Sequence, residues 1–217
     1  MALGWGMIST GGHPDNNIAP AMKAARDGEL VAVYSRDQGR GDAFAEKHGA
    51  KAAYDSVDAL LADSRVDAVF VSSPNHLHAQ HGLLSAAAGK HVLMEKPMTT
   101  TLEDAVALVN GCRNGGVKLG MGFMMRHHMG HVQARNVIQK GALGRVTLAQ
   151  VQGGSGVRGQ GTPPPRTGLR AWWEDPASMG GASSMMGTGV HLVDLLRFVL
   201  GQEVTEVAAI TDGQTDA

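Results

Sequence analysis

The sequence predicts an α/β fold in which a doubly wound parallel sheet is followed by a second, α+β unit. Short apolar runs alternate with helical patterns through the first half of the chain, and polar or glycine-rich turns follow several of those runs. Alternation of this kind produces a parallel sheet with helices on both faces, which is a nucleotide-binding architecture. The pattern changes after Gly120. We therefore expect one domain over residues 1–122 and a second over residues 123–217.

In the first domain, apolar runs bounded by turn residues predict the strands. The run Val66–Ser72, Val-Asp-Ala-Val-Phe-Val-Ser, is the strongest of them. The expected strands are Leu3–Ser9, Leu30–Tyr34, Val66–Ser72, His91–Met94 and Val117–Gly120. The expected helices are Asn17–Asp27, Gly41–His48, Asp55–Ala62, Leu77–Ala88 and Thr100–Arg113, the last opened by a capping box at Thr100-x-x-Glu103.

The second domain begins with an expected helix, Gly130–Lys140, and an expected strand, Arg145–Gln152. The stretch Gly153–Gly168 is rich in glycine and proline and predicts a loop that acts as a lid. Apolar spacing predicts a helix over Gly189–Leu200, and Val204–Ile210 reads as another strand. A sheet that stops at its second strand has an unprotected edge, so we expect a fragment of a longer chain.

Composition limits the class of partner. The net charge is −1, with 43% hydrophobic and 18% charged residues, which is typical of a globular protein and does not favour nucleic acid or an anionic membrane. No apolar run reaches membrane-spanning length. Cys112 is the only cysteine, so no intramolecular disulfide can form, and a reducing cytoplasm is the expected location.

The turn after the first strand has the composition of a dinucleotide-binding loop. It reads Ser9-Thr10-Gly11-Gly12-His13, and the following residues begin a helix. Such a turn lets backbone N–H groups approach a pyrophosphate at the helix N-terminus. The G-x-G-x-x-G pattern is imperfect, because Ser9 takes the place of the first glycine and Pro14 the place of the third.

The end of the second strand predicts which cofactor is bound. A carboxylate there holds the ribose 2′-hydroxyl of NAD, whereas a basic group holds the 2′-phosphate of NADP. Ser35 and Arg36 come first and favour NADP, with Arg40 as a helper. Asp37 follows directly and keeps NAD open. The alternative for Arg36 is an exposed turn residue.

Two further segments lie at the carboxyl edge of the expected sheet. Ser73-Pro74-Asn75 and His78 follow the strongest strand and are candidates to line the nicotinamide side of a cofactor cleft, although Asn75 also fits a helix cap. Glu95-Lys96-Pro97 ends the next strand, where open α/β sheets bind ligands. Position alone leaves Lys96 either at a bound ligand or in a solvated turn.

These motifs together resemble the glucose-fructose oxidoreductase, inositol dehydrogenase and rhizopine-catabolism (Gfo/Idh/MocA) family. The resemblance rests on the glycine turn, Pro74-Asn75-x-x-His78, Ala87–Pro97, Gly141-Ala142-Leu143-Gly144 and Gly189–Asp194. It implies a Rossmann domain followed by a domain with a mostly antiparallel sheet that carries the substrate pocket and an oligomer interface. It also implies hydride transfer between NADP(H) or NAD(H) and a secondary alcohol carbon of a sugar or cyclic polyol, and a homo-oligomer at full length.

The resemblance also implies residue roles. Lys96 would hydrogen-bond the reacting oxygen and relay a proton, Glu95 would set the nicotinamide end, and His191 would be the principal acid/base. Arg126 would reach the cofactor or the substrate. Trp173 would pack against a sugar face, with burial in the core as the alternative.

One position departs from the family pattern. A carboxylate is expected four residues before His191, and Gly187 stands there. Either Lys96 and His191 work with another assisting group, or the chemistry differs; Asp194 is not an obvious substitute. His127 and His131 share a helical face, but zinc requires three or four converging ligands, so we expect no metal.

The leading interpretation is an oxidoreductase that prefers NADP(H) and acts on a sugar or polyol. Two alternatives remain open: a glycosidase of the same fold that uses tightly bound NAD, and a non-catalytic regulator that binds the cofactor. Lys96 and His191 favour chemistry, whereas Gly187 favours the regulator.

Overall fold

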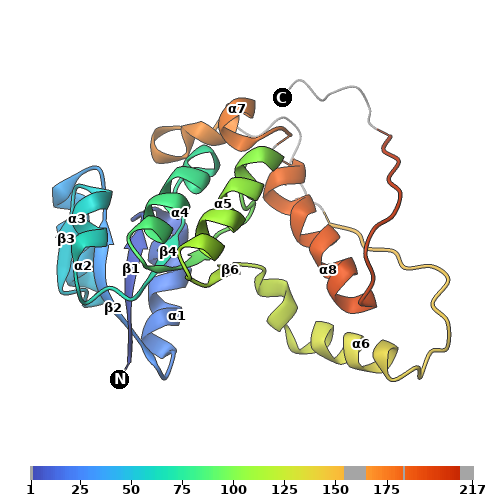
Figure 1. The fold of residues 1–217 in the computed structure, drawn as a ribbon. Helices are drawn as coiled ribbons and strands as arrows, with labels where there is room; N and C mark the ends of the chain where they lie inside the picture. Colours follow the sequence, from blue (N-terminus) through green and yellow to red (C-terminus); the bar gives the residue numbers. More distant parts are fainter. Residues whose placement is uncertain (1, 154–164, 183, 211–217) are drawn as a thin grey trace. The chain divides into compact units, whose positions relative to one another are not determined.

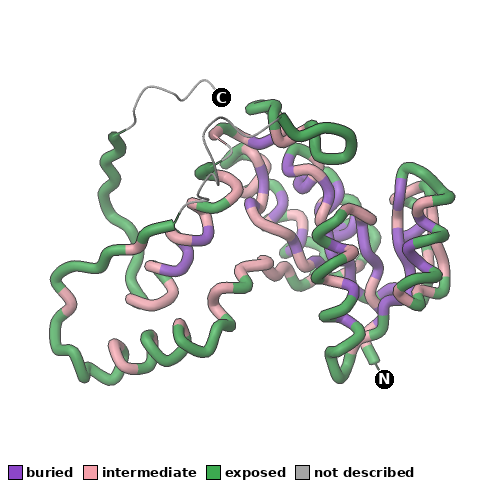
Figure 2. Tube along the Cα trace, turned by 180° about the vertical axis from the view of Figure 1, so that it is seen from behind, coloured by how far each residue is buried: buried purple, intermediate pink, exposed green. Residues whose placement is uncertain are grey.

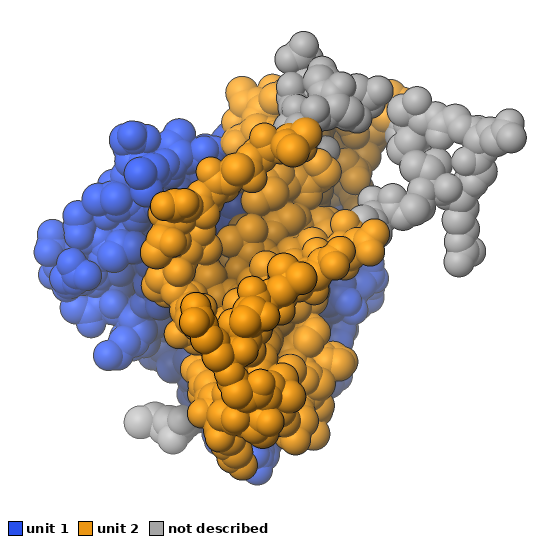
Figure 3. Space-filling view, turned by 90° about the vertical axis from the view of Figure 1, so that its right-hand side faces the viewer, with its two compact units in different colours: residues 1–122 blue, residues 123–217 orange. Residues whose placement is uncertain are grey.

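The computed structural model describes residues 2–153, 165–182 and 184–210. The chain divides into two compact units, Met1–Gly122 and Phe123–Ala217, which Figure 3 colours separately. Most of the glycine- and proline-rich stretch that we expected to form a lid lies outside the described residues. No helix in the described part of the chain combines the length and the apolar character that crossing a membrane requires.

The first unit is built on a six-stranded sheet with the order β3-β2-β1-β4-β5-β6. Every neighbouring pair is parallel, and the winding reverses between β1 and β4, so the doubly wound Rossmann-type sheet is confirmed. The strands are β1 (Leu3–Ile8), β2 (Gly28–Tyr34), β3 (Ala52–Tyr54), β4 (Ala68–Val71), β5 (His91–Met94) and β6 (Leu119–Met121).

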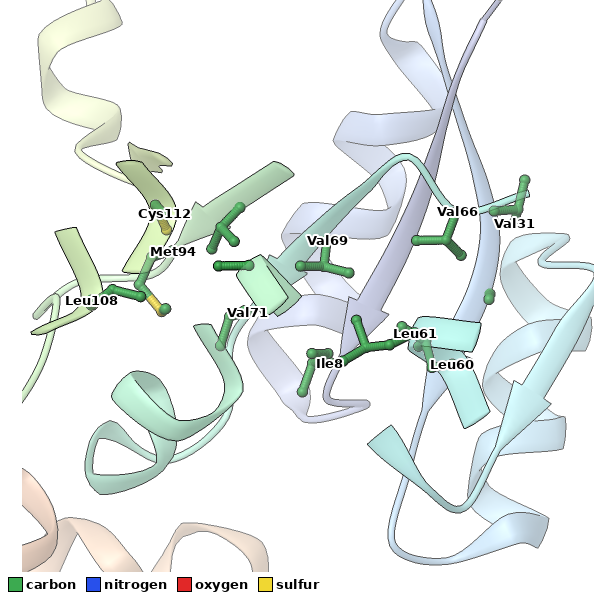
Figure 4. Packing of buried hydrophobic residues seen from close by; sticks show 13 residues of the cluster. Ile8, Val31, Leu60, Leu61, Val66, Val69, Val71, Met94, Leu108 and Cys112 are labelled. Atoms are coloured by element: carbon green, nitrogen blue, oxygen red, sulfur yellow. The ribbon is translucent and has the colours of Figure 1, made fainter. Parts of the chain in front are cut away.

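Helices cover both faces of this sheet (Figure 1). The alternation of side chains along β4 divides the core, because Val69 and Val71 lie in one buried cluster and Phe70 lies in the other. The first cluster includes residues of α3, α4 and α5, and Figure 4 shows it. The second includes residues of α1 and α2. The helices are η1 (Pro14–Ile18), α1 (Ala19–Ala24), α2 (Gln38–His48), α3 (Val57–Ala62), η2 (Asn75–Leu77), α4 (His78–Ala87) and α5 (Leu102–Asn114).

Two local predictions in this unit were wrong. The three-residue strand β3 was not predicted, because a run as short as Ala52–Tyr54 has no readable alternation and pairs only through its neighbour β2. The cap of α5 is Thr101 and not Thr100: the Thr101 hydroxyl accepts a hydrogen bond from the Asp104 backbone N–H at 3.1 Å. The sequence offers three consecutive threonines, and the backbone conformation selects the last of them.

The second unit is helical in its described part. Arg135 donates from its guanidinium to the Phe198 carbonyl and so joins α6 to α8, which ends at Gly201 with a positive φ of 65°. The elements are η3 (Met124–His127), α6 (Met129–Gln139), η4 (Gly168–Glu174), α7 (Pro176–Met179), η5 (Met185–Gly189) and α8 (Val190–Leu200).

The two strands predicted for the second unit are absent from its described residues. Arg145–Gln152, which follows α6, and Val204–Ile210, which follows α8, run without assigned secondary structure and are mostly exposed, as the mostly green tube of Figure 2 shows. A strand is stabilised by backbone hydrogen bonds to a neighbouring strand, and neither segment has such a neighbour among the described residues. The antiparallel sheet expected from the family resemblance is therefore not observed here.

Candidate active site

The glycine turn lies between β1 and η1 and is held in an unusual conformation. Ser9 has a φ of +138°, and it is the only described residue other than glycine with a positive φ. Its hydroxyl accepts a hydrogen bond from the Gly11 backbone N–H at 3.2 Å. Ser9 therefore occupies a conformation that glycine adopts without strain, as expected for a residue in the place of the first glycine.

His13 connects this turn to the end of β5. Its Nε2 lies 3.1 Å from Glu95 Oε1, and the Asn17 side-chain amide lies 3.2 Å from its Nδ1. Asn17 donates and Glu95 accepts, so the neutral imidazole with its proton on Nε2 satisfies both contacts. Two loops that are far apart in sequence therefore meet at the carboxyl edge of the sheet.

The Glu95 carboxylate is fixed on both oxygens. Oε1 takes the bond from His13, and Oε2 accepts the Lys96 backbone N–H at 3.1 Å. Burial tends to raise the pKa of Glu95, but the hydrogen bond from His13, together with the charge of Lys96, outweighs it and lowers that pKa. Glu95 thus stays ionised beside Lys96, whose peptide bond to Pro97 is cis.

Arg40 joins the glycine turn to the end of β2. Its Nε donates to Thr10 Oγ1 at 3.3 Å and to Ser35 Oγ at 3.2 Å. The terminal guanidinium nitrogens have no hydrogen-bond partner in the part of the chain that the structure describes. They are the donors that a phosphate group at this edge would use.

The residues next to Arg40 make different hydrogen bonds from those of its side chain. Asp37 caps α2, because its Oδ1 accepts the Arg40 backbone N–H at 2.7 Å. Ser35 is buried, and its hydroxyl also accepts the Asp37 backbone N–H. Arg36 is exposed, and its side chain makes no hydrogen bond or ion pair with the other described residues. The structure therefore makes Arg40, which the sequence offered only as a helper, the fixed arginine of this edge.

The loop after β4 is anchored by two histidines of α4. His78 Nε2 lies 2.8 Å from the Ser73 carbonyl oxygen and its Nδ1 lies 2.7 Å from the Pro97 carbonyl oxygen. His81 Nδ1 lies 2.9 Å from Ser73 Oγ, and burial lowers the pKa of His81 to about 4.

This arrangement changes the role expected for His78. Its side chain is 1% exposed and both ring nitrogens face backbone carbonyls, so it supports the loops and does not line a cleft. Burial lowers the pKa of His78, against the effect of the two carbonyls and the Glu95 charge. Asn75 is buried in η2, Pro74 precedes it, and the N-cap of α4 is Leu77 without a side-chain cap.

In the second unit, His191 lies in the first turn of α8 and is buried. Asp194 follows one turn later and is also buried, and both of its oxygens accept hydrogen bonds from Arg126. The bond to Asp194 raises the pKa of Arg126. The Phe123 ring contacts both the histidine and the arginine: its centroid lies 6.1 Å from that of the His191 ring and 5.6 Å from the Arg126 guanidinium carbon.

Gly187 and Trp173 are in contact. A Cβ added at Gly187 would lie 3.0 Å from Trp173 Cζ3, so the indole lies where a side chain at this position would begin. The Arg166 guanidinium covers the ring at 4.6 Å. Trp173 is half-buried in this packing, and its contact with a sugar stays a prediction. The turn η5 that contains Gly187 is a π-helix, and such turns are frequent at functional sites.

No group of three or more metal-ligating side chains gathers among the described residues, and His131 instead contacts the Met125 carbonyl through Nδ1.

The structure thus assembles most of the predicted cofactor residues at one sheet edge of the first unit. These are Ser9, Thr10, Gly11, Gly12, His13, Ser35, Ser73 and Glu95, with Lys96 at the end of β5. Of the other predicted residues, Arg36 is exposed after β2, and Pro74, Asn75 and His78 belong to the segment after β4 that leads into α4. Arg126, Trp173 and His191 belong to the second unit. Sequence reasoning missed the Arg126–Asp194 pair, although the His-x-x-Asp spacing places two polar side chains on one helical face and a buried carboxylate requires a cation.

Comparison with known proteins identifies relatives over most of the chain. Residues 3–123 match the family model "Oxidoreductase family, NAD-binding Rossmann fold". Residues 131–217 match the model "GFO/IDH/MocA C-terminal domain".

Curated relatives are longer than this chain. A 1,5-anhydro-D-fructose reductase from Ensifer adhaerens is 37% identical over 207 residues, which are 95% of this chain and 59% of that protein. A D-xylose 1-dehydrogenase (NADP(+)) from Haloferax volcanii is 34% identical over 96% of this chain and 60% of that protein. The chain therefore spans about three fifths of the length of these relatives.

Solved structures agree in fold. An aldose-aldose oxidoreductase from Caulobacter crescentus, in complex with glycerol, superposes with a TM-score of 0.78 at 26% identity, over 94% of this chain and 59% of that one. A 3-ketoreductase from Actinomadura kijaniata, in complex with NADP and TDP-benzene, gives a TM-score of 0.61 at 34% identity, over 65% of this chain and 43% of that one.

Proposed function

Because the chain belongs to the GFO/IDH/MocA oxidoreductase family, we propose that it carries the cofactor-binding and reacting residues of an oxidoreductase that prefers NADP(H). The reaction is hydride transfer at a secondary alcohol or carbonyl carbon of a sugar or cyclic polyol. The observation that carries this proposal is the contact between His13 and Glu95, which brings the glycine turn and the strand end bearing Lys96 to the same sheet edge.

The residues at this edge fit a dinucleotide. The turn Ser9–Gly12 leads into a helix whose first N–H groups suit a pyrophosphate, and the absence of a Cβ at Gly11 and Gly12 favours a close approach of a ligand to this backbone. Glu95 would set the nicotinamide end, and Ser73 follows the adjacent strand. When bound, the nicotinamide supplies or accepts the hydride.

Arg40 supports the preference for NADP. Its Nε is engaged by Thr10 and Ser35, which leaves the terminal nitrogens to bind the 2′-phosphate, and Arg36 adds positive charge nearby in sequence. Asp37, which would favour NAD, is used as the cap of α2. The Haloferax relative is named for NADP(+), and the Actinomadura structure contains NADP.

Lys96 is the residue proposed to act on the reacting oxygen. Its ammonium group would donate a hydrogen bond to that oxygen, stabilise the negative charge that develops on it during reduction, and deliver the proton that completes the alcohol. Glu95 accepts a hydrogen bond from the Lys96 backbone N–H and so helps to fix the backbone at Lys96.

His191 is proposed as the second acid/base group. The Arg126–Asp194 pair fixes the first turns of α8 to η3, and in this way it holds the helix that carries His191. A carboxylate at position 187 is not available to orient the substrate, and Trp173 packs there instead. The proton chemistry is therefore assigned to Lys96 and His191 together.

The names of the relatives support a polyhydroxylated substrate. They include the two sugar enzymes above and an inositol 2-dehydrogenase from Saccharopolyspora erythraea that is 32% identical over 97% of this chain. A homo-oligomeric assembly and a cytoplasmic location stay predictions.

A substrate screen tests the proposal. Sugars, keto-sugars and inositols are mixed with the protein, and the absorbance of NADPH and NADH is followed. We expect turnover with at least one of these compounds, faster with NADPH than with NADH at limiting cofactor. Release of a sugar without net change in cofactor would instead favour the NAD-dependent glycosidase. Tight cofactor binding without turnover on any compound, unaffected by Lys96→Ala, would favour the regulator.

A further inference from the structure

His78 has a hydrogen-bonding arrangement that the proposed chemistry does not use. Its imidazole lies between two backbone carbonyls, Pro97 on the segment after β5 and Ser73 on the loop after β4. Carbonyl oxygens only accept hydrogen bonds, and the neutral imidazole that burial favours carries one N–H, so only one of the two contacts can be a donated bond. The contact from Nδ1 to the Pro97 carbonyl is the shorter, at 2.7 Å against 2.8 Å, and we assign the proton to it. Pro97 follows Lys96 directly in the chain.

We propose that His78 is a positioning residue for Lys96, which it holds in place by donating a hydrogen bond from Nδ1 to the Pro97 carbonyl. This inference rests on the proposed function of Lys96 as the group that contacts the reacting oxygen. The Nδ1 to oxygen distance of 2.7 Å is that of a well-formed bond, and the side chain is almost fully buried. Water therefore does not compete for the carbonyl, and the bond fixes the segment next to Lys96.

The surroundings of His78 hold the ring still. His78 is the first residue of α4. The loop after β4, whose Ser73 carbonyl His78 contacts, is also held by His81, because the His81 ring contacts the Ser73 hydroxyl. Glu95 fixes the other side of Lys96 through its backbone N–H. The backbone on both sides of Lys96 is therefore anchored, by Glu95 before it and by His78 after it.

Two isosteres separate the contacts of His78. In His78→Asn, the side-chain amide occupies the Nδ1 position and keeps a donor for Pro97. In His78→Gln, the amide reaches the Nε2 position, faces Ser73 and leaves the Pro97 carbonyl without its donor. Ser85→Ala is the matched control for stability, since Ser85 is buried in the same helix, bonds only the His81 carbonyl and does not contact Pro97.

We expect His78→Gln to lower kcat about tenfold or more, because a small displacement of a reacting group has a large effect on rate. His78→Asn and Ser85→Ala should keep kcat within about twofold, and all three should bind NADPH as the wild type does. Equal losses in the Asn and Gln variants, or full activity in both, would overturn the proposal.

A measurement on the wild-type protein without cofactor tests the same contact independently of activity. Long-range ¹H–¹⁵N spectra of histidine-labelled protein, with the His78 signal assigned by its loss in His78→Asn, report which ring nitrogen carries a proton. We expect Nδ1 of His78 to be protonated at neutral pH. An unprotonated Nδ1 would overturn the positioning role even if the protein proves to be an active oxidoreductase. A protonated Nδ1 in a protein without any turnover would leave the contact standing and contradict only the proposed function.

Discussion

At the scale of single residues, Arg40 is the side chain that we propose distinguishes the two nicotinamide cofactors. Its Nε is held by Thr10 and Ser35, so its terminal nitrogens are oriented before any phosphate arrives. Arg36 has no such support. The arginine that stands first in sequence is therefore not the one that the fold fixes.

Replacing Arg40 should affect NADPH far more than NADH. Loss of a charge-assisted contact to the 2′-phosphate costs about 1.5–3 kcal/mol, so Arg40→Ala should weaken NADPH binding about ten- to a hundredfold. NADH binding should change little, and Arg36→Ala should have the smaller effect of the two arginine variants on NADPH. Fluorescence titration with both cofactors measures this. Equal losses for NADPH and NADH would refute the assignment.

Ser9 is strained by its backbone conformation, and two substitutions distinguish the strain from the loss of its hydroxyl. Both Ser9→Gly and Ser9→Ala lose the bond to the Gly11 N–H, but alanine keeps the Cβ that disfavours a φ of +138°. The strain energy that glycine removes from the folded state is larger than the extra conformational entropy that glycine loses on folding. Ser9→Gly should therefore be more stable than Ser9→Ala by about 1 kcal/mol. Urea denaturation gives the comparison, and a more stable alanine variant would show that the turn is unstrained.

At the scale of elements, the turn between α3 and β4 depends on Asp63. Its carboxylate accepts two side-chain hydrogen bonds from Arg65, at 2.9 and 2.6 Å, and one from the Tyr54 hydroxyl at 3.1 Å. The hydrogen bond from Arg65 is the main reason that the pKa of Asp63 falls from 3.8 to about 2, and burial opposes it. A lowered pKa in the folded state stabilises the protein above the unfolded value, and this stabilisation is lost as the pH falls through about 2.

Asp63→Asn should therefore lower the free energy of unfolding at neutral pH, by about 1–2 kcal/mol, since Arg65 is half exposed and solvent weakens the pair. The difference from the wild type should shrink between about pH 4 and pH 2. Denaturation across this range measures it, with the exposed Asp55→Asn as control. A difference that stays constant with pH would contradict an electrostatic origin.

The packing of α4 against α5 depends on Gly82. A Cβ there would lie 2.6 Å from Leu108 Cδ1 and 2.8 Å from Met94 Cε, and both of those side chains are fully buried. Gly82→Val should therefore destabilise the first unit by about 1–3 kcal/mol. Introducing valine at the exposed position 80 of the same helix, in Gln80→Val, should change the free energy of unfolding by less than about 0.5 kcal/mol. Thermal or urea denaturation compares the two; similar effects would mean that the helices tolerate a larger separation.

The sequence predicted elements well where local pattern and tertiary environment agree. His91–Met94 was predicted with its observed bounds, because an apolar strand buried in a parallel sheet has a continuous apolar run. Val204–Ile210 has the residues of a strand but no strand beside it among the described residues. Pairing is a long-range property, and neither periodicity nor composition contains it. The roles of Arg40, His78 and Asp194 depend in the same way on partners distant in sequence or hidden from local pattern.

At the scale of the whole molecule, the residues proposed to act in the reaction are divided between two units. The first holds the dinucleotide-type sheet edge with Lys96, and the second holds His191 on a helix fixed by the Arg126–Asp194 pair. The chain matches the models of both domains of the family and spans about three fifths of the length of its first curated relatives. In the proposed reaction, Lys96 acts in the chemical step, and cofactor binding depends on other residues.

The most direct test of this claim is the rate of NADPH oxidation by the wild type and by Lys96→Ala with a keto-sugar or other carbonyl substrate identified in the screen. NADPH binding is measured on the same samples. Removing a donor to the developing alkoxide should lower kcat about 10²- to 10³-fold, while NADPH binding stays within about twofold of the wild type. Unchanged kcat in Lys96→Ala would contradict the account, as would a loss of rate explained entirely by weaker cofactor binding.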